Sequence, residues 1–380
     1  MQFRDLKRQY DVLRYEIDGA IQSVLSTSTF IGGEPVAKLE QELLEYVGIA
    51  ECITCANGTD ALTLSMRAHG IGKGDFVFVP AFSYIASAST ISLVGAIPVF
   101  VDVDKRTFNI DCDALEKAIL DFHKYSDLSP KAIIAVDLFG LPFDYERLTK
   151  IAKRENLLII EDCAQGFGGR IRNRKACSFG DISTTSFFPA KPLGCYGDGG
   201  AIFTNDKEIA DRIRMLKSNG ASPTDKYDNL IIGTNSRLDS LQAAILSIKL
   251  RAFIDTEIEA VNKVARMYLE RLSGSMQVPV VPDGFYSAWA QFTIVLKNHE
   301  LRDGLKKRLA DRGIPSMIYY KKPLHLQKAF EGIKQFNNSM QISEFLAERV
   351  LSLPMHPYLT VKEVDLVCNE IHKYIKGLKR

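Results

Sequence analysis

The 380-residue sequence lacks several features that mark specialised classes of protein. Lys and Arg total 48 and Asp and Glu total 46, so the net charge is only +2 and there is no basic surplus for neutralising nucleic-acid phosphates. No apolar run approaches the roughly 18 residues that a membrane-spanning helix needs. The first eight residues are charged and contain no apolar signal-peptide core. We therefore expect neither a nucleic-acid partner nor a membrane partner.

Cysteine, metal-ligand motifs and dinucleotide motifs are also sparse. Seven cysteines, an odd number scattered over a long chain, predict free thiols in a reducing compartment, so we expect a cytoplasmic location. Cys52 and Cys55 form one C-x-x-C pair without a second pair or a His pair, and the six histidines lack ligand spacing, so no metal site is expected. Gly166, Gly168 and Gly169 do not give the G-x-G-x-x-G spacing of nicotinamide-binding proteins.

What is present is an alternation of short apolar runs with helical patterns. Such alternation predicts βαβ units, a largely parallel sheet and right-handed crossovers. The predicted strands are Phe76–Val79, Ile97–Val101, Ala132–Val136 and Leu157–Ile160. The predicted helices are Ala61–Ala68, Leu115–Leu120 and Tyr145–Arg154.

The pattern changes near residue 240. Two predicted helices, Leu241–Leu250 and Ala260–Leu272, follow each other without a strand between them. After them come predicted strands at Phe292–Leu296 and Ser316–Ile318 and predicted helices at Leu301–Asp311 and Val361–Lys376. Since a single core stops growing near about 250–300 residues, we expect a large α/β domain over residues 1–250 and a smaller α+β domain over residues 251–380.

A lysine lies in a Pro/Gly-rich turn between two further strand-like runs. Lys191 follows Ser183–Ser186 and precedes Ala201–Thr204. A lysine on a rigid, desolvated turn has a lowered pKa and can act as a nucleophile or a base. A surface lysine in a glycine-rich turn gives the same pattern, and this segment alone supports both interpretations equally.

An acidic pair ends another predicted strand. Glu161 and Asp162 follow Leu157–Ile160 at the carboxyl end, where open α/β sheets bind ligands. An acid there can hold a protonated ring nitrogen. For this segment alone, however, a strand-end acid that caps the next helix is the favoured interpretation.

A turn at Ala56-Asn57-Gly58-Thr59 opens a predicted helix, and free amides at a helix N-terminus bind phosphate. Alone, this pattern is more typical of a plain capped helix start. Together, however, an anion-binding helix N-terminus, a strand-end acid and a lysine on a tight turn are what pyridoxal 5′-phosphate requires.

These segments carry a resemblance to a known family. With Phe30-Ile31-Gly32-Gly33, Asn235-Ser236-Arg237 and Leu353-Pro354-Met355-His356-Pro357, they make nearly the whole chain similar to the nucleotide-sugar aminotransferases of the DegT/StrS group. The resemblance implies fold type I of the pyridoxal-phosphate-dependent transferases: a mostly parallel sheet flanked by helices and a smaller C-terminal α+β domain.

The resemblance also implies roles for individual residues. Lys191 matches the Schiff-base lysine and Asp162 the acid on the pyridine nitrogen, so both are expected to be catalytic. The other expected cofactor contacts are Gly58, Thr59 and Ser186 at the phosphate, Tyr84 stacked on the ring, Gln165 near the ring hydroxyl, and Asn235, a phosphate ligand supplied by the neighbouring subunit of a homodimer. Arg237, Tyr319 and Tyr320 are the expected substrate-binding residues.

The form of the lysine segment looks most like the subgroup that acts on UDP-2-acetamido-3-oxo sugars, especially the 3-oxo-glucuronate. This implies amino transfer from L-glutamate to give a 3-amino sugar for bacterial surface polysaccharide. A 4-keto-sugar aminotransferase (UDP- or dTDP-linked) and a sugar dehydratase are the alternatives; the dehydratases replace the lysine with histidine, so Lys191 favours transamination. Two segments depart from the common family pattern: Tyr319-Tyr320-Lys321 replaces His-Tyr-Pro, and Asn219-Gly220 replaces His-Gly.

Overall fold

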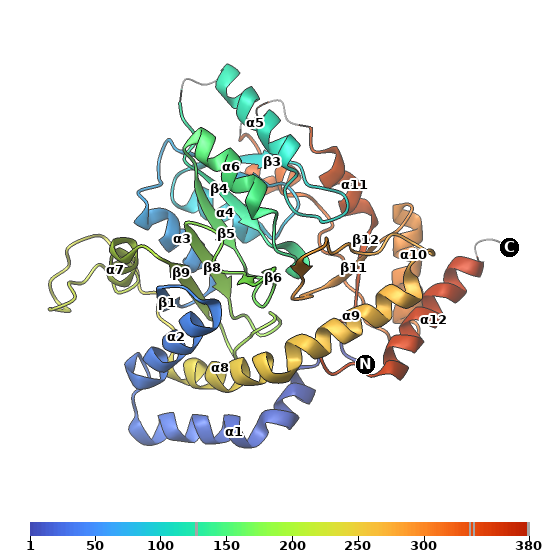
Figure 1. Ribbon diagram of the computed structural model, residues 1–380, viewed down its shortest axis with the longest axis horizontal. Coiled ribbons are helices and arrows are strands. Elements are labelled where there is room, and N and C mark those ends of the chain that lie inside the picture. Colours follow the sequence, from blue (N-terminus) through green and yellow to red (C-terminus); the bar gives the residue numbers. More distant parts are fainter. Residues whose placement is uncertain (126–127, 334–335, 337–338, 378–380) are drawn as a thin grey trace.

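The computed structural model describes residues 1–125, 128–333, 336 and 339–377. In this part of the chain a seven-stranded sheet, in the order β1-β9-β8-β5-β4-β2-β3, is flanked by helices (Figure 1). The strands are β1 (Glu51–Cys55), β2 (Phe76–Pro80), β3 (Ile97–Val101), β4 (Ala132–Val136), β5 (Leu158–Asp162), β8 (Ile182–Ser186) and β9 (Gly200–Thr204). The predicted fold class is confirmed.

The directions of the strands place their carboxyl ends together. The pairs β2–β3, β2–β4, β4–β5 and β5–β8 are parallel, whereas β9 is antiparallel to both β8 and β1. Six strands therefore run the same way. Cys55, Asp162 and Ser186 end β1, β5 and β8 at the same edge of the sheet.

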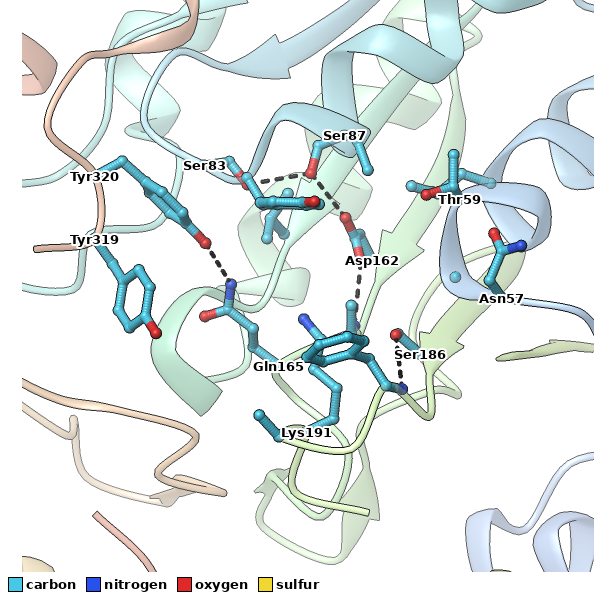
Figure 2. A pocket seen from close by; sticks show the side chains of 18 of the residues that line it. Asn57, Thr59, Ser83, Ser87, Asp162, Gln165, Ser186, Lys191, Tyr319 and Tyr320 are labelled. Atoms are coloured by element: carbon cyan, nitrogen blue, oxygen red, sulfur yellow. Dashed lines mark hydrogen bonds between the residues drawn. The ribbon is translucent and has the colours of Figure 1, made fainter. Parts of the chain in front are cut away.

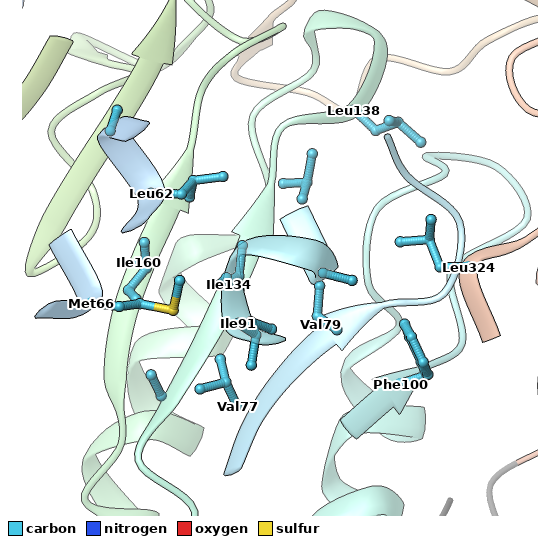
Figure 3. Packing of buried hydrophobic residues seen from close by; sticks show 14 of the residues in the cluster. Leu62, Met66, Val77, Val79, Ile91, Phe100, Ile134, Leu138, Ile160 and Leu324 are labelled. Atoms are coloured by element: carbon cyan, nitrogen blue, oxygen red, sulfur yellow. The ribbon is translucent and has the colours of Figure 1, made fainter. Parts of the chain in front are cut away.

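The strands are continuous apolar runs in the sequence because both faces of the sheet are buried. In β2, Val77 and Val79 join one core cluster, whereas Phe76 and Phe78 join another on the opposite face. Figure 3 shows the first cluster, in which Leu62 and other side chains of the helices pack on the sheet. This face is covered by α3 (Gly58–Ala68), α4 (Ile85–Leu93) and α7 (Lys207–Leu216); the other face is covered by α2 (Gly33–Val47), α5 (Cys112–Tyr125), α6 (Tyr145–Glu155) and α8 (Ser240–Ala252).

The N-terminal helix α1 (Leu6–Thr27) lies outside this layer. Leu13 and Ile17 pack against Ile245 of α8, and the two helices run side by side at the edge of the molecule (Figure 1). Neither α1 nor α2 was predicted as an element from the sequence.

The C-terminal part has its own cluster, in which α9 (Ile258–Leu272), α10 (His299–Ala310) and α12 (Val361–Gly377) pack around the antiparallel pair β11 (Phe292–Val295) and β12 (Val350–Leu353). The predicted strand Ser316–Ile318 is wrong as an extended element: only Met317 makes an isolated bridge, to Ser352. Shorter elements complete the described chain: β6 (Arg170–Ile171), β7 (Arg174–Lys175), β10 (Phe285–Tyr286), α11 (Gln341–Arg349), η1 (Leu138–Gly140), η2 (Phe253–Glu257), η3 (Leu324–Leu326) and η4 (Lys328–Phe330).

The two halves of the chain are joined by more than one connection. The helical run α8–η2–α9 continues through residue 250, the last residue of the expected large domain. Leu324, Phe330 and Leu346 belong to the same core cluster as the sheet. At the other end of the sequence, the Phe3 carbonyl accepts a hydrogen bond from the Met355 amide at 3.1 Å.

Across the described residues, no helix has both the length and the apolar character that crossing a bilayer demands.

Candidate active site

A cavity of about 560 Å³ opens at the carboxyl ends of β5 and β8. Its wall contains nine of the predicted site residues, brought together from both halves of the sequence (Figure 2). They are Gly58, Thr59, Tyr84, Asp162, Gln165, Ser186, Lys191, Tyr319 and Tyr320. The two remaining predicted residues, Asn235 and Arg237, do not line it.

Asp162 is the last residue of β5 and is only 4% exposed. Its Oδ2 accepts a hydrogen bond from Ser87 Oγ at 2.9 Å, and its Oδ1 accepts one from the Ala164 amide at 3.1 Å. Burial raises the pKa of Asp162, while these two hydrogen bonds and the charge of Lys191 act in the opposite direction. The carboxylate is therefore held in a fixed orientation inside the cavity.

Lys191 lies on the turn that follows β8, and its amide donates to the Phe188 carbonyl at 2.8 Å. Burial lowers the pKa of Lys191, the Asp162 carboxylate raises it, and the charge of Arg4 lowers it further. A lysine with a lowered pKa releases its proton more readily, so its amine is a better nucleophile and base near neutral pH.

The N-terminus of α3 forms the wall on one side. Asn57 caps the helix by accepting a hydrogen bond from the Asp60 amide at 2.8 Å. Gly58 and Thr59 occupy the first two helical positions, whose amides have no partner within a helix. Gly58 is required by a close approach, because a Cβ there would lie 2.7 Å from Ser186 Cβ. The Ser186 hydroxyl and these two amides are thus positioned to bind an anion.

Gln165 and three tyrosines form the opposite wall. Gln165 Oε1 accepts from the Phe139 amide at 2.8 Å, and its Nε2 donates to the Tyr320 hydroxyl at 3.1 Å. Burial raises the pKa of Tyr320, so its hydroxyl stays neutral at physiological pH. Tyr84 is 53% exposed and its ring centroid lies 6.4 Å from that of Tyr320. A planar ligand therefore has aromatic surface available at the cavity mouth.

Asn235 and Arg237 are exposed and lie near the end of loop 217–239, which joins α7 to α8. Arg237 Nε donates to Asn235 Oδ1 at 3.0 Å, and both side chains are exposed. Between them, Ser236 is buried and donates to Asp60 Oδ2 at 2.7 Å. The segment is thus attached to the first turn of α3, while Asn235 and Arg237 themselves do not line this chain's cavity.

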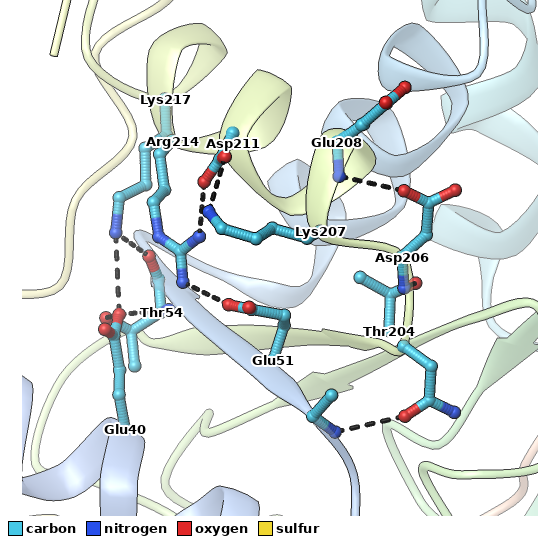
Figure 4. Close-up of polar contacts among 12 residues, drawn as sticks. Glu40, Glu51, Thr54, Thr204, Asp206, Lys207, Glu208, Asp211, Arg214 and Lys217 are labelled. Carbon is cyan, nitrogen blue, oxygen red and sulfur yellow. Dashed lines mark hydrogen bonds and ion pairs between the residues drawn. The ribbon is translucent and has the colours of Figure 1, made fainter.

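The loop is fastened at its base. The Lys217 carbonyl accepts from the Ser236 amide at 2.9 Å. Lys217 Nζ donates to the Thr54 carbonyl at 2.7 Å and lies 3.7 Å from Glu40 Oε1 (Figure 4). Further along, Tyr227 and Ile232 are 81% and 86% exposed.

The sequence patterns missed several cavity residues. Ser87 holds Asp162 directly, but a serine in an apolar helix carries no pattern of its own. Gln291 also lines the cavity, and its buried Oε1 has no hydrogen-bond partner among the residues that the structure describes. Asn57 lies in the turn that the sequence identified as a helix start, but it was not predicted as a site residue, although Asn is a preferred helix N-cap.

A second group of acidic and thiol side chains lies beneath the cavity. Asp137, Glu161 and Cys163 are close enough together to hold a metal ion, yet they bond to one another and to the protein. Glu161 accepts from the Cys163 thiol, from the Ser183 hydroxyl and from three backbone amides of residues 177–180. Burial and the neighbouring Glu161 raise the pKa of Asp137. We interpret this group as a structural network.

A buried acid and a lysine at neighbouring strand ends, beside an anion-binding helix, define a cofactor-binding transferase site on this fold. The model of the DegT/DnrJ/EryC1/StrS aminotransferase family matches residues 12–372, and the chain belongs to this family.

Individual relatives match over nearly their full lengths. The chain is 41% identical to the UDP-2-acetamido-2-deoxy-3-oxo-D-glucuronate aminotransferase of Pseudomonas aeruginosa, covering 97% of this chain and 98% of the relative. A solved DegT/DnrJ/EryC1/StrS aminotransferase from Brucella abortus is 49% identical, with a TM-score of 0.95 and coverage of 98% and 99%. DesV from S. venezuelae is 35% identical, with a TM-score of 0.92 and coverage of 99% and 98%.

Proposed function

We propose that the protein transfers an amino group from L-glutamate to UDP-2-acetamido-2-deoxy-3-oxo-glucuronate, giving a 3-amino sugar for surface polysaccharide. The enzyme is a pyridoxal-phosphate-dependent nucleotide-sugar aminotransferase of the DegT/DnrJ/EryC1/StrS family. The observation that carries the chemistry is the pair Asp162 and Lys191 in one cavity. The 41% identity to the Pseudomonas aeruginosa enzyme supports the choice of sugar.

The residues present fit this cofactor. The amides of Gly58 and Thr59 and the Ser186 hydroxyl suit its phosphate, because they form an anion site at a helix N-terminus. Asp162 is positioned to pair with a protonated ring nitrogen. Tyr84 supplies an aromatic face, and Gln165 a fixed amide for the ring hydroxyl.

When bound, the cofactor withdraws electrons from the carbon that carries the amino group. Lys191 Nζ would hold the cofactor while no substrate is bound. Its free amine would then move a proton from that carbon to the cofactor. Asp162 keeps the ring nitrogen protonated through its negative charge. The same residues act in reverse on the keto sugar, so the reaction follows ping-pong kinetics.

Arg237 would bind a carboxylate of the substrate, because guanidinium and carboxylate match in planar geometry. Tyr319 and Tyr320 would contact the sugar from the cavity wall. Since both glutamate and a uronate sugar carry a carboxylate, Arg237 has two possible partners.

We further propose a homodimer with shared active sites. Asn235 and Arg237 are exposed on a loop fastened next to α3, and exposed Tyr227, Leu230 and Ile232 lie on the same loop. These features suit a loop that reaches a second copy of the chain, where Asn235 would bind the partner's cofactor phosphate. A cytoplasmic location is proposed because all seven cysteines are free thiols.

The sugar assignment is tested by mass spectrometry of products from a panel of UDP- and dTDP-linked 3-keto and 4-keto sugars with glutamate. We expect the amine product mainly from the UDP-linked 3-oxo-glucuronate, with 2-oxoglutarate formed in equal amount. A preference for a 4-keto sugar would contradict the assignment. A dehydrated sugar formed without 2-oxoglutarate would reject transamination.

The shared site is tested by mixing two inactive variants, Lys191→Ala and Asn235→Asp. A hybrid dimer has one site with neither substitution, so activity should partly return. Absence of recovery, with subunit exchange demonstrated by differential labelling, would contradict a site built from two chains.

A further inference from the structure

The segment before α1 reaches the lysine turn from the other end of the sequence. Arg4 Nη2 donates to the Lys191 carbonyl at 2.7 Å and lies 3.3 Å from the Pro192 carbonyl. Lys191 and Arg4 are separated by 187 positions in the sequence. One guanidinium nitrogen therefore contacts two consecutive carbonyls of the turn that carries the lysine.

The same segment is fixed to the C-terminal part of the chain. The Phe3 carbonyl accepts from the Met355 amide at 3.1 Å, and the Phe3 ring lies 6.1 Å from the ring of Tyr319, which lines the cavity. Asp5, the next residue after Arg4, caps α1 by accepting from the Arg8 amide at 3.0 Å. Arg4 is thus held on both sides before it reaches the turn.

The hydrogen bonds within the Lys191 turn leave some of its carbonyls to be bound by residues from outside the turn. Its internal hydrogen bonds run from Lys191 to Phe188 and from Cys195 to Phe187. The Lys191 and Pro192 carbonyls take no part in these two bonds and accept from Arg4. Further along the turn, the buried Lys249 donates to the Gly194 carbonyl.

We propose that Arg4 is a positioning residue that fixes the Lys191 turn and links it to the Tyr319 side of the cavity. The proposal rests on the proposed role of Lys191. Arg4 does not reach the reacting atoms; it acts by holding the peptide from which the lysine side chain extends. Since a misplacement of about 1 Å can cost roughly 100-fold in rate, the orientation of that peptide matters for proton transfer.

Arg4 also acts on Lys191 through its charge. Arg4 lowers the pKa of Lys191, in addition to the larger effect of burial, and Asp162 opposes both. The other titratable groups on the cavity wall are Tyr84, Asp198, Tyr319 and Tyr320. Removing Arg4 should therefore raise the pKa of Lys191, because one like charge is lost and Asp162 remains.

The test compares Arg4→Met, Arg4→Lys and a matched control, Arg8→Met. Arg8 donates to the Tyr358 carbonyl at 2.7 Å and pairs with Glu363, so its loss weakens the same N-terminal attachment without touching the lysine turn. Two measurements use the apoprotein: hydrogen exchange of residues 188–196, and competitive acetylation of Lys191 against pH, each read by mass spectrometry. A third measurement compares kcat and KM of the cofactor-bound variants with those of the wild type.

For Arg4→Met we expect amide exchange in the turn to rise about three- to tenfold, the scale of one lost hydrogen bond. We expect the pKa of Lys191 to rise, because the like charge of Arg4 is removed. We expect kcat to fall about tenfold while KM for glutamate changes less than about twofold. Arg4→Lys keeps the charge, but its shorter side chain does not bring a nitrogen to the position of Arg4 Nη2. The pKa of Lys191 should therefore stay near that of the wild type while amide exchange in the turn rises.

Unchanged exchange or an unchanged Lys191 pKa in Arg4→Met would overturn the proposal, as would the same changes in Arg8→Met. Borohydride reduction of each cofactor-bound variant distinguishes a failure of the Arg4 proposal from a failure of the proposed function. Cofactor trapped on Lys191 supports the role of the lysine whatever Arg4 does, whereas cofactor trapped on another lysine rejects it.

Discussion

The strand-end cavity and loop 217–239 hold their predicted site residues in different ways. In the cavity, Asp162 is 4% exposed and held by two hydrogen bonds. On the loop, Asn235 and Arg237 are exposed and bond to each other, although the base of the loop is fastened through Lys217 and Ser236.

The cavity holds the groups proposed to carry out the chemistry, whereas the loop holds groups proposed for recognition. Groups that depend on a fixed orientation and a shifted pKa lie on strand ends, where burial supplies both. Asn235 and Arg237, which are proposed to contact a second chain and the substrate, lie on a loop, where a change of sequence leaves the sheet intact. Substitutions of Lys191 and Asp162 in the cavity should therefore slow turnover most, whereas substitution of Arg237 on the loop should mainly change affinity and selectivity.

The largest effect is expected from Lys191→Ala. Without the amine there is neither a covalent link to the cofactor nor a base for the proton, so turnover should be essentially lost. Mass spectrometry of the borohydride-reduced, digested protein should find the pyridoxyl group on Lys191 in the wild type and on no lysine in the variant. A label on a different lysine in the wild type would reject this assignment.

Asp162→Asn keeps the shape of the side chain but removes its charge. The ring nitrogen should then lose its proton, and the rate should fall by roughly two to four decades, or about 3–5 kcal/mol of transition-state stabilisation. Single-turnover absorbance with glutamate measures the loss. A variant within a few-fold of the wild type would remove Asp162 from this role.

Arg237→Met tests the loop. The cofactor spectrum should stay intact while binding of acidic substrates weakens about 30- to 800-fold, equivalent to about 2–4 kcal/mol. The two half-reactions distinguish the partner: a defect confined to the sugar half, larger for a uronate than for its neutral counterpart, indicates the sugar carboxylate. An equal defect with glutamate indicates a shared carboxylate site. Unchanged kinetics with a weakened dimer would show that Arg237 is structural.

Ser87→Ala should have the smallest effect of the four. It removes one hydrogen bond to Asp162 Oδ2, so the pKa of Asp162 should rise and the rate should fall about five- to tenfold. Ser83→Ala is the control, because Ser83 contacts Ser87 at 3.1 Å rather than Asp162. Equal losses in both variants would indicate a general packing effect.

The sequence predicted the sheet well because its strands are buried on both faces. Ile97–Val101 and Ala132–Val136 are found at the predicted positions, since a short continuous apolar run between turns is typical of a strand in a covered parallel sheet. Ser316–Ile318 is only three residues long and begins with a polar residue, and only Met317 makes a bridge, to Ser352. So short a segment carries too little periodicity to distinguish a strand from a loop.

The site was predictable where its residues lie in short motifs at strand ends. Asp162 and Lys191 belong to such motifs, and the family resemblance supplied roles that spacing alone left open. Ser87 and Arg4 were not predictable, because each acts through a contact made across a large sequence separation. The positions of Asn235 and Arg237 outside the cavity likewise required the fold.

Glu161 and Asp162 are consecutive on β5 and serve opposite sides of it, one in the structural network and the other in the cavity. Successive strand residues alternate in direction, so a shift of one position exchanges the two acids. A single-residue insertion or deletion within Leu158–Asp162 would then direct Glu161 at the cavity and leave its backbone donors unsatisfied. Homologous proteins should therefore keep the length of this strand even where its side chains differ. Differences in length between them should lie in the loops.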